Sequence, residues 1–367
     1  MKQLAVVLIG VGSMIALASS AGCTRSHDVG AGAQASGQIL PIELDDSCLE
    51  EIAESVNSLP KRLSCTGLYT DIGKRSVARG VEPYVPGARL WSDGLNKVRY
   101  IFLPPGSSID AAQPNAWDFP VGTRFWKEFQ APDETPIETR LYFKIEQGDW
   151  RQTTYQWNPQ LTEALRVDQA KTIMVGDQMH YLPSPSDCEE CHKGRRDRVL
   201  GFEQVALGLP EASGETLEKL VADRRLKNFE GPTEYHIGAD DESVEAHALG
   251  WMHMNCGVTC HSDVQSSKGY STGLRMRLDP AELEGGPLGE VAVEKTGVGV
   301  QAKTMRWLGR TRIVPGASQD SLLYSLITQR GDKTQQMPPL ATFLVDTEYS
   351  DWVKKWIDAM PGAPTPQ

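Results

Sequence analysis

Residues 186–192 read Ser186-Asp187-Cys188-Glu189-Glu190-Cys191-His192. This stretch contains Cys-x-x-Cys-His, the attachment signal of c-type haem. Two thiols separated by two residues can form thioethers with the two vinyl groups of one haem, and the histidine that follows can bind the iron. The sequence therefore predicts that Cys188, Cys191 and His192 bind a first haem, with His192 as an iron ligand.

A related stretch follows at residues 255–261, Asn255-Cys256-Gly257-Val258-Thr259-Cys260-His261, with one more residue between the cysteines. A loop with three intervening residues can bulge enough for both thiols to reach one haem. We therefore expect Cys256 and Cys260 to attach a second haem c and His261 to bind its iron.

A methionine on a loop completes the second predicted site. Residues 335–340 read Gln335-Gln336-Met337-Pro338-Pro339-Leu340, shortly before the last predicted helix. A thioether sulfur on a proline-stiffened loop is a suitable sixth ligand, and His/Met ligation raises the haem potential. Met337 is therefore predicted to bind the second iron opposite His261.

Other chemistry is available to these cysteines. Each pair could form a disulfide, and the four together could bind zinc. Haem attachment, unlike zinc binding, requires a histidine directly after the second cysteine, and both stretches have one. The sixth ligand of the first haem stays open, and the candidates are Met179, His180, His236, His247 and His253.

The start of the chain is typical of an exported lipoprotein. Residues 1–22 combine Lys2, a short apolar run and small residues, as a signal peptide does. Ser20-Ala21-Gly22-Cys23 is similar to a lipobox, which predicts lipidation of Cys23; the alternative is ordinary cleavage near Ala21 that leaves a free thiol. Residues 23–40 would then form a lipid-anchored flexible tether. We expect a periplasmic protein held by this anchor, most simply at the outer membrane.

Two cysteines remain, Cys48 and Cys65, and an oxidising compartment favours a disulfide between them. The chain has 37 basic and 48 acidic residues, a formal charge of −11, which argues against nucleic-acid binding. Its 40% hydrophobic content is that of a globular protein.

The predicted elements give an α+β fold class. Four aromatic and β-branched runs separated by turns indicate an antiparallel sheet, at residues 98–103, 122–129, 138–145 and 151–157. Helices are expected at 49–63, at 242–255 and from Asp346 or Thr347 to Met360. We expect a β-rich domain over 41–230 that carries the first motif, followed by an all-α domain over 242–362.

Residues 247–360 resemble a class I cytochrome c domain. The resemblance implies His261 as the proximal ligand, Met337 as the distal ligand, and packing of the Trp352/Trp356 helix near Gly250. From about residue 48 to 360 the chain also resembles an uncharacterised family of exported bacterial cytochrome-like proteins. The matching segments are Leu90–Asp93, Phe102–Gly106, Phe119–Thr123, Ile137–Leu141, Tyr155–Asn158 and Ile313–Gly316.

The first half is more weakly similar to the β-sheet cytochromes c prime and their lysine-cross-linked relatives. In those proteins a five-coordinate haem packs against an antiparallel sheet. This resemblance draws attention to Lys127 and Lys144 on predicted strands. The simpler expectation is that both lysines point outward into solvent.

The expected function is electron transfer by an exported di-haem cytochrome that exchanges electrons with an unidentified redox partner protein. One alternative is a haem enzyme, a peroxidase or an oxidoreductase of small nitrogen compounds, with an open first haem. Another is a structural subunit of a larger oxidoreductase.

Overall fold

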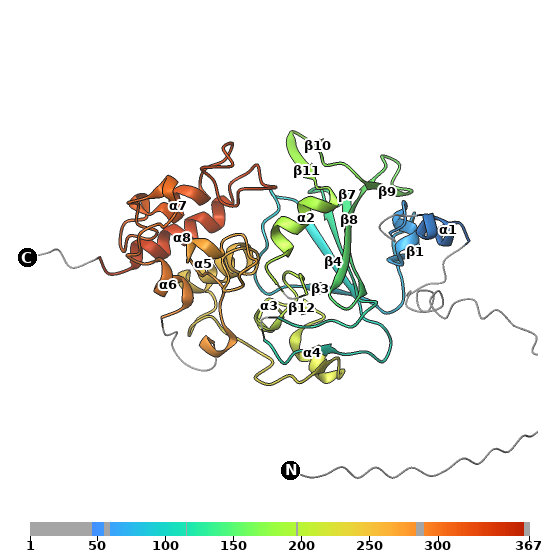
Figure 1. Cartoon of the computed structure of the whole chain (residues 1–367), viewed down its shortest axis with the longest axis horizontal. Helices are drawn as coiled ribbons and strands as arrows, with labels where there is room; N and C mark the ends of the chain where they lie inside the picture. The colour runs from blue at the N-terminus through green and yellow to red at the C-terminus, as the bar shows by residue number, and fades with distance from the viewer. Residues whose placement is uncertain (1–45, 55–58, 115, 196, 284–289, 363–367) are drawn as a thin grey trace, which may run out of the picture. The chain divides into compact units, whose positions relative to one another are not determined.

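The four predicted strands are confirmed and form the centre of a larger sheet (Figure 1). The computed structural model describes residues 46–54, 59–114, 116–195, 197–283 and 290–362. The sheet is antiparallel, in the order β12-β3-β4-β6-β7-β8-β9. Its strands are β3 (Val81–Val85), β4 (Asn96–Phe102), β6 (Arg124–Gln130), β7 (Pro136–Glu146), β8 (Asp149–Trp157), β9 (Ala164–Val167) and β12 (Ser213–Gly214).

Both faces of this sheet are covered, because successive side chains alternate between two cores. One face packs against the N-terminal segment through Leu59, Leu63, Phe102, Trp126 and Tyr155. The opposite face carries Ile101, Phe125 and Tyr142 into a larger core that also includes Phe202, Trp251 and Trp356. Residues of the two Cys-His motifs lie on this second face.

Three two-stranded ladders lie around the main sheet. They are β1 (Tyr69–Asp71) with β2 (Ser76–Val77), β10 (Lys171–Val175) with β11 (Gln178–Leu182), and β5 (Ile109–Asp110) with β13 (Leu226–Lys227). The last pair is parallel. A tight hairpin turn joins β7 to β8, and Gly148 adopts a φ of +76° there.

The helices are short except for the last one. They are α1 (Asp46–Glu54), α2 (Pro185–His192), α3 (Gln204–Gly208), α4 (Leu217–Ala222), α5 (Val244–Met252), α6 (Ala292–Gly297), α7 (Leu322–Ile327) and α8 (Thr347–Ala359). Asp346 caps α8 by accepting a hydrogen bond from the Tyr349 N–H, and Val353, Trp356 and Ile357 are buried. The structure is therefore a mixed α+β fold.

Helix α5 packs against α8 near Gly250, as the sequence led us to expect. His247 stacks on Trp352, the ring of Trp251 lies parallel to that of Tyr349, and Trp251 Nε1 donates to Asp346 at 3.1 Å. A Cβ added at Gly250 itself would meet Ile237 and Ala88.

The described residues all belong to one compact unit, Ile39–Gln367, with a core that spans the boundary between the two predicted domains. Their division into two domains stays a prediction. The predicted disulfide is confirmed: Cys48 and Cys65 are bonded, with their Cα atoms 5.2 Å apart. The predicted signal peptide, Cys23 and the predicted tether lie outside the described residues. Within the part that is described, no helix is long and apolar enough to cross a membrane.

Candidate functional site

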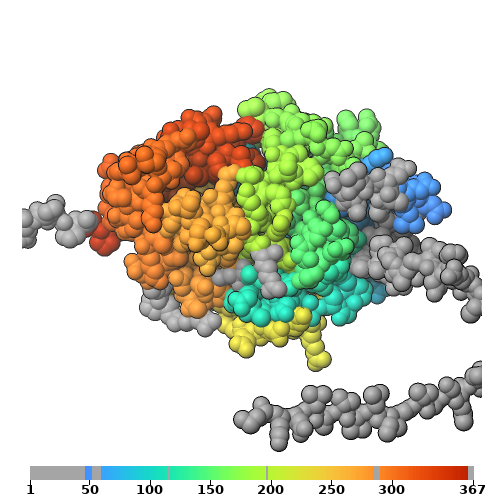
Figure 2. All heavy atoms as spheres, viewed as in Figure 1, coloured from blue at the N-terminus to red at the C-terminus, as the bar shows by residue number. Residues whose placement is uncertain are grey.

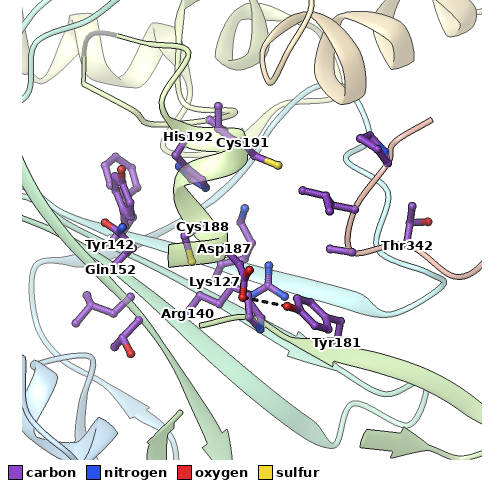
Figure 3. Close-up of a pocket in the computed structure, with 18 of the residues that line it drawn as sticks. Lys127, Arg140, Tyr142, Gln152, Tyr181, Asp187, Cys188, Cys191, His192 and Thr342 are labelled. Atoms are coloured by element: carbon purple, nitrogen blue, oxygen red, sulfur yellow. Dashed lines mark hydrogen bonds between the residues drawn. The ribbon is translucent and has the colours of Figure 1, made fainter. Parts of the chain in front are cut away.

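Helix α2 brings the first motif against the sheet. Pro185 occupies its first turn, and the Ser184 N–H donates to Asp187 Oδ2 at 2.9 Å, which fixes where the helix begins. Cys188, Cys191 and His192 then line a cavity of about 430 Å³. This volume falls within the usual range of ligand and cofactor sites. Figure 3 shows these side chains on α2, with Lys127, Arg140 and Tyr142 on the strands beside them and Thr342 on a loop across the cavity.

His192 is held as a metal-binding histidine usually is. Its Nδ1 lies 2.6 Å from the carbonyl oxygen of Arg198, which can only accept, so Nδ1 carries the proton. Nε2 is thereby left with a free lone pair, and a hydrogen bond of this kind orients metal-binding imidazoles. Burial, reinforced by the nearby Lys127 ammonium, lowers the pKa of His192 to about 3. The imidazole is therefore neutral at physiological pH, as iron ligation requires.

A second cavity lies at the other motif. Cys256, His261 and Met337 line it together with apolar side chains, among them Leu274, Leu323 and Ile327. Burial lowers the pKa of His261 to about 4, and His261 also hydrogen-bonds the backbone of Leu274. The donor set matches a His/Met haem site. The cavity measures about 70 Å³, so a group the size of haem requires its apolar walls to move apart.

The extra residue of the second motif is accommodated by a wide, π-type turn of the backbone over residues 253–261. The His261 N–H donates to the Cys256 carbonyl, five residues back, at 2.7 Å, and Val258 bonds to His253 in the same manner at 2.8 Å. Such π-type turns accommodate one inserted residue. Gly257 is required within it, because an added Cβ would lie 2.6 Å from the Arg277 backbone. The spacer thus bulges as the sequence led us to expect.

The two motifs are in contact with each other. The thiols of Cys191 and Cys260 lie close enough to interact, which lowers the pKa of Cys191 to about 7 and raises that of Cys260. Around them, Glu190 pairs with Lys268, and Ser266 Oγ donates to the Lys193 carbonyl at 2.8 Å. The structure thus places Cys256 in the second cavity and Cys260 at the junction with the first motif.

Gly194 permits this close approach. A Cβ at this position would lie 2.9 Å from the Ser267 Cβ and 3.2 Å from the Thr259 carbonyl. Figure 2 shows the yellow-green surface around α2 directly beside the orange surface of the residues beyond 250.

A single loop contributes to both cavities. Met337 faces the second cavity, whereas Gln336 and residues 339–343 line the first. Asp93 holds this loop in place: its carboxylate accepts hydrogen bonds from Thr342 Oγ1 at 2.8 Å and from the Phe343 N–H at 2.8 Å. Asp93 is 6% exposed. In the sequence, Leu90–Asp93 stands out only as a segment of the family resemblance. No sequence pattern indicated that Asp93 would bind the loop that contains Thr342 and Phe343.

The candidate sixth ligands of the first haem lie elsewhere. The cavity lining described for the first site contains none of the five. His180 bonds Glu138 at 2.8 Å, and both nitrogens of His253 are used, by Glu203 and by the Leu278 N–H. The other three are engaged or exposed at the surface: His236 beside Asp241, His247 stacked on Trp352, and Met179, which is 50% exposed.

The expectation that Lys127 and Lys144 are solvated is wrong, because α2 and the chain after it cover the face from which both project. Lys144 is fully buried, and its Nζ donates to Asp118 at 2.7 Å and to Asp197 at 2.8 Å. Lys127 is partly buried and lines the first cavity. Its neighbours Arg99 and Arg140 were not singled out from the sequence, since strand register cannot be read from the runs alone.

No three His, Cys, Asp or Glu side chains among the described residues converge in a group that could hold a metal ion. Comparison of the chain with protein-family models, curated proteins and solved structures finds no match.

Proposed function

We propose that the protein is an exported di-haem c-type cytochrome that transfers electrons. The observation that carries the proposal is the hydrogen bond from His192 Nδ1 to the Arg198 carbonyl, 2.6 Å long, on a histidine that directly follows Cys188 and Cys191. This hydrogen bond leaves the unprotonated Nε2 of His192 available at the cavity that Cys188 and Cys191 also line.

Cys188 and Cys191 would attach the first haem and His192 would bind its iron. Cys256 and Cys260 would attach the second haem, with His261 and Met337 as iron ligands. A bound haem supplies reversible one-electron chemistry at its iron. The protein sets the potential through the ligands, through burial and through neighbouring charges.

The contact between the motifs supports transfer between the two sites. Because Cys191 and Cys260 lie close together, where Glu190 pairs with Lys268, the groups attached to them would be neighbours. An electron accepted at one site would then have a short path to the other. In this proposal residues 242–362 act as a class I cytochrome c-like domain, and the lipid anchor at Cys23 keeps the protein at a membrane near its redox partner.

A redox titration tests the proposal. The protein is exported with the haem-maturation machinery and titrated while its visible spectrum is recorded. Two c-type haems that reduce and reoxidise reversibly are expected. Haem that cannot be cycled reversibly would contradict the role as an electron carrier.

A haem enzyme with an open first iron is the second candidate. The placement of the five candidate sixth ligands away from the first cavity favours it. In that case the ferrous protein binds carbon monoxide at the first haem, and the ferric protein gives a high-spin electron paramagnetic resonance signal that is lost in His192→Ala. Two low-spin haems that do not bind the gas would exclude this candidate.

A further inference from the structure

A row of cations crosses three neighbouring strands of the sheet. Arg99 on β4 lies opposite Lys127 on β6, and Lys127 lies opposite Arg140 on β7. Directly opposed residues of antiparallel strands point to the same face, where like charges destabilise the sheet. The face is the one that α2 covers. Three basic side chains are therefore aligned on this face, with Arg99 buried and Lys127 and Arg140 partly buried, and we call them the cation row.

The cation row is only partly neutralised. Arg140 forms two hydrogen bonds with the buried carboxylate of Glu138, at 2.6 and 3.2 Å. Arg99 is 7% exposed, and its Nε has no hydrogen-bond partner among the described residues. No described group accepts a hydrogen bond from the Lys127 side chain, although its backbone is paired in the sheet. Within the row, Arg140 thus has a carboxylate partner, whereas Arg99 and Lys127 have none in the described part of the chain.

The electrostatic surroundings disfavour the charged forms of Lys127 and Arg99 as long as no anion is present. Burial, together with Arg99 and Arg140, lowers the pKa of Lys127 to about 7. Burial also lowers the pKa of Arg99. A buried cation without a partner is costly, so such a row is expected where an anion binds.

The row lies at the wall of the first cavity. Lys127 and Arg140 line this cavity together with Cys188 and His192, and Figure 3 shows both cations beside Cys188. Arg99 lies one strand further, on the wall of a neighbouring cavity of about 680 Å³. An anion that reaches the row from the first cavity must therefore be part of the group bound by Cys188 and His192, or must lie next to that group.

We propose that Arg99, Lys127 and Arg140 bind the two propionate carboxylates of the haem attached at Cys188 and Cys191. This assignment rests on the proposed function. The two propionate carboxylates would give partners to Arg99 and Lys127, the two side chains of the row that have no carboxylate partner among the described residues. The other source of such an anion is a small soluble oxyanion, and the test separates the two.

The test uses the holoprotein and the variants Lys127→Gln and Arg99→Gln. Loss of either cation leaves a propionate without its counter-charge, which disfavours the added electron. The midpoint potential of the first haem should fall, and the resonance Raman band of propionate bending should shift. The second haem should keep its potential. Lys127→Arg, which retains the charge, should restore the wild-type potential.

Arg124→Gln is the matched control. Arg124 lies on the same strand β6 and is also buried, but it projects from the opposite face, where its guanidinium lies 3.9 Å from the Phe143 ring centre. The Arg124→Gln variant should leave the midpoint potential and the propionate Raman band of the first haem unchanged. If Lys127→Gln and Arg99→Gln shift them no more than Arg124→Gln does, the assignment is overturned.

Inorganic phosphate added to the wild-type protein tests the soluble source. No change in potential is expected, because the propionates occupy the row. A saturable shift that disappears in Lys127→Gln would show that the row binds free anions and would overturn the assignment. An intact mass measured on each sample identifies the separate case in which no haem is attached and the proposed function itself fails.

Discussion

His192 and Met337 are each positioned by a backbone hydrogen bond. The His192 ring is fixed by the Arg198 carbonyl, while the Met337 N–H donates to the Leu326 carbonyl at 2.8 Å. The sequence identified both residues from motif and loop context. It could not identify the carbonyls that orient them, because those contacts depend on how the chain returns to each site.

Replacement of Met337 by alanine tests its role as an iron ligand. We expect the weak near-infrared charge-transfer band of His/Met haem to disappear and one midpoint potential to fall, because the thioether favours the reduced iron. Met179→Ala is the control, since Met179 is exposed and lies outside both cavities. If Met337→Ala leaves the band and both potentials unchanged, Met337 serves only in packing.

At the scale of elements, the central strands could be predicted closely and the helices only in part. The strands are marked by aromatic and β-branched runs with turns between them, so β4, β6, β7 and β8 begin and end within two residues of expectation. The helix expected over 242–255 ends as an α-helix at Met252, because the chain then widens into the π-type turn that holds Cys256. That turn arises from the inserted residue of the motif, which periodicity alone does not reveal.

Asp93 is predicted to control the loop that serves both sites. In Asp93→Asn the new amide would face the Phe343 N–H, so a donor would meet a donor, while asparagine tolerates the residue's φ of +52°. We expect the free energy of unfolding to fall by about 3 kcal/mol. The near-infrared charge-transfer band assigned to ligation by Met337 should also weaken, because the loop that carries Met337 becomes less ordered. Denaturant unfolding and near-infrared spectra measure both effects.

Asp149→Asn is the control for Asp93. It removes a carboxylate from an exposed ion pair with Arg151 at 3.0 Å, and such pairs contribute about 0–1 kcal/mol. A loss in Asp93→Asn no larger than in this control would contradict the role assigned to Asp93.

The Glu203–His253 contact, 3.1 Å long, predicts a dependence of stability on pH. Burial alone would raise the pKa of Glu203, but the hydrogen bond from His253, with Arg195 and Arg277 nearby, brings it down from 4.5 to about 2. Because the folded pKa lies below the unfolded one, the stabilisation is fully present above pH 4.5 and is lost as the pH falls through about 2. The shift corresponds to about 3 kcal/mol.

Unfolding of the apoprotein by denaturant across this pH range measures the effect. Glu203→Gln should be less stable near neutral pH, and its free energy of unfolding should depend less on pH than that of the wild type. The variant Glu218→Gln, at an exposed position, should keep the wild-type dependence on pH. If the free energy of unfolding depends on pH equally in the wild type and in Glu203→Gln, another group accounts for the acid sensitivity.

At the scale of the whole molecule, the sequence identified the residues of each candidate site but not the relation between the sites. Cys191 and Cys260 are 69 positions apart in the sequence, and their contact depends on how the segment around Gly194 packs against residues 259–268. The cation row likewise requires the register of three strands. Long-range packing of this kind leaves no periodic signal in a single sequence, so both features emerged only from the structure.

The central claim is that two haems are covalently bound, and the intact mass of the denatured protein after export with the haem-maturation machinery tests it most directly. The account predicts the mass of the processed chain plus two haems, with one haem lost in the double variant Cys188→Ala/Cys191→Ala and the other in Cys256→Ala/Cys260→Ala. A mass with one haem would contradict the di-haem assignment. A mass with none would contradict the proposed function as a whole.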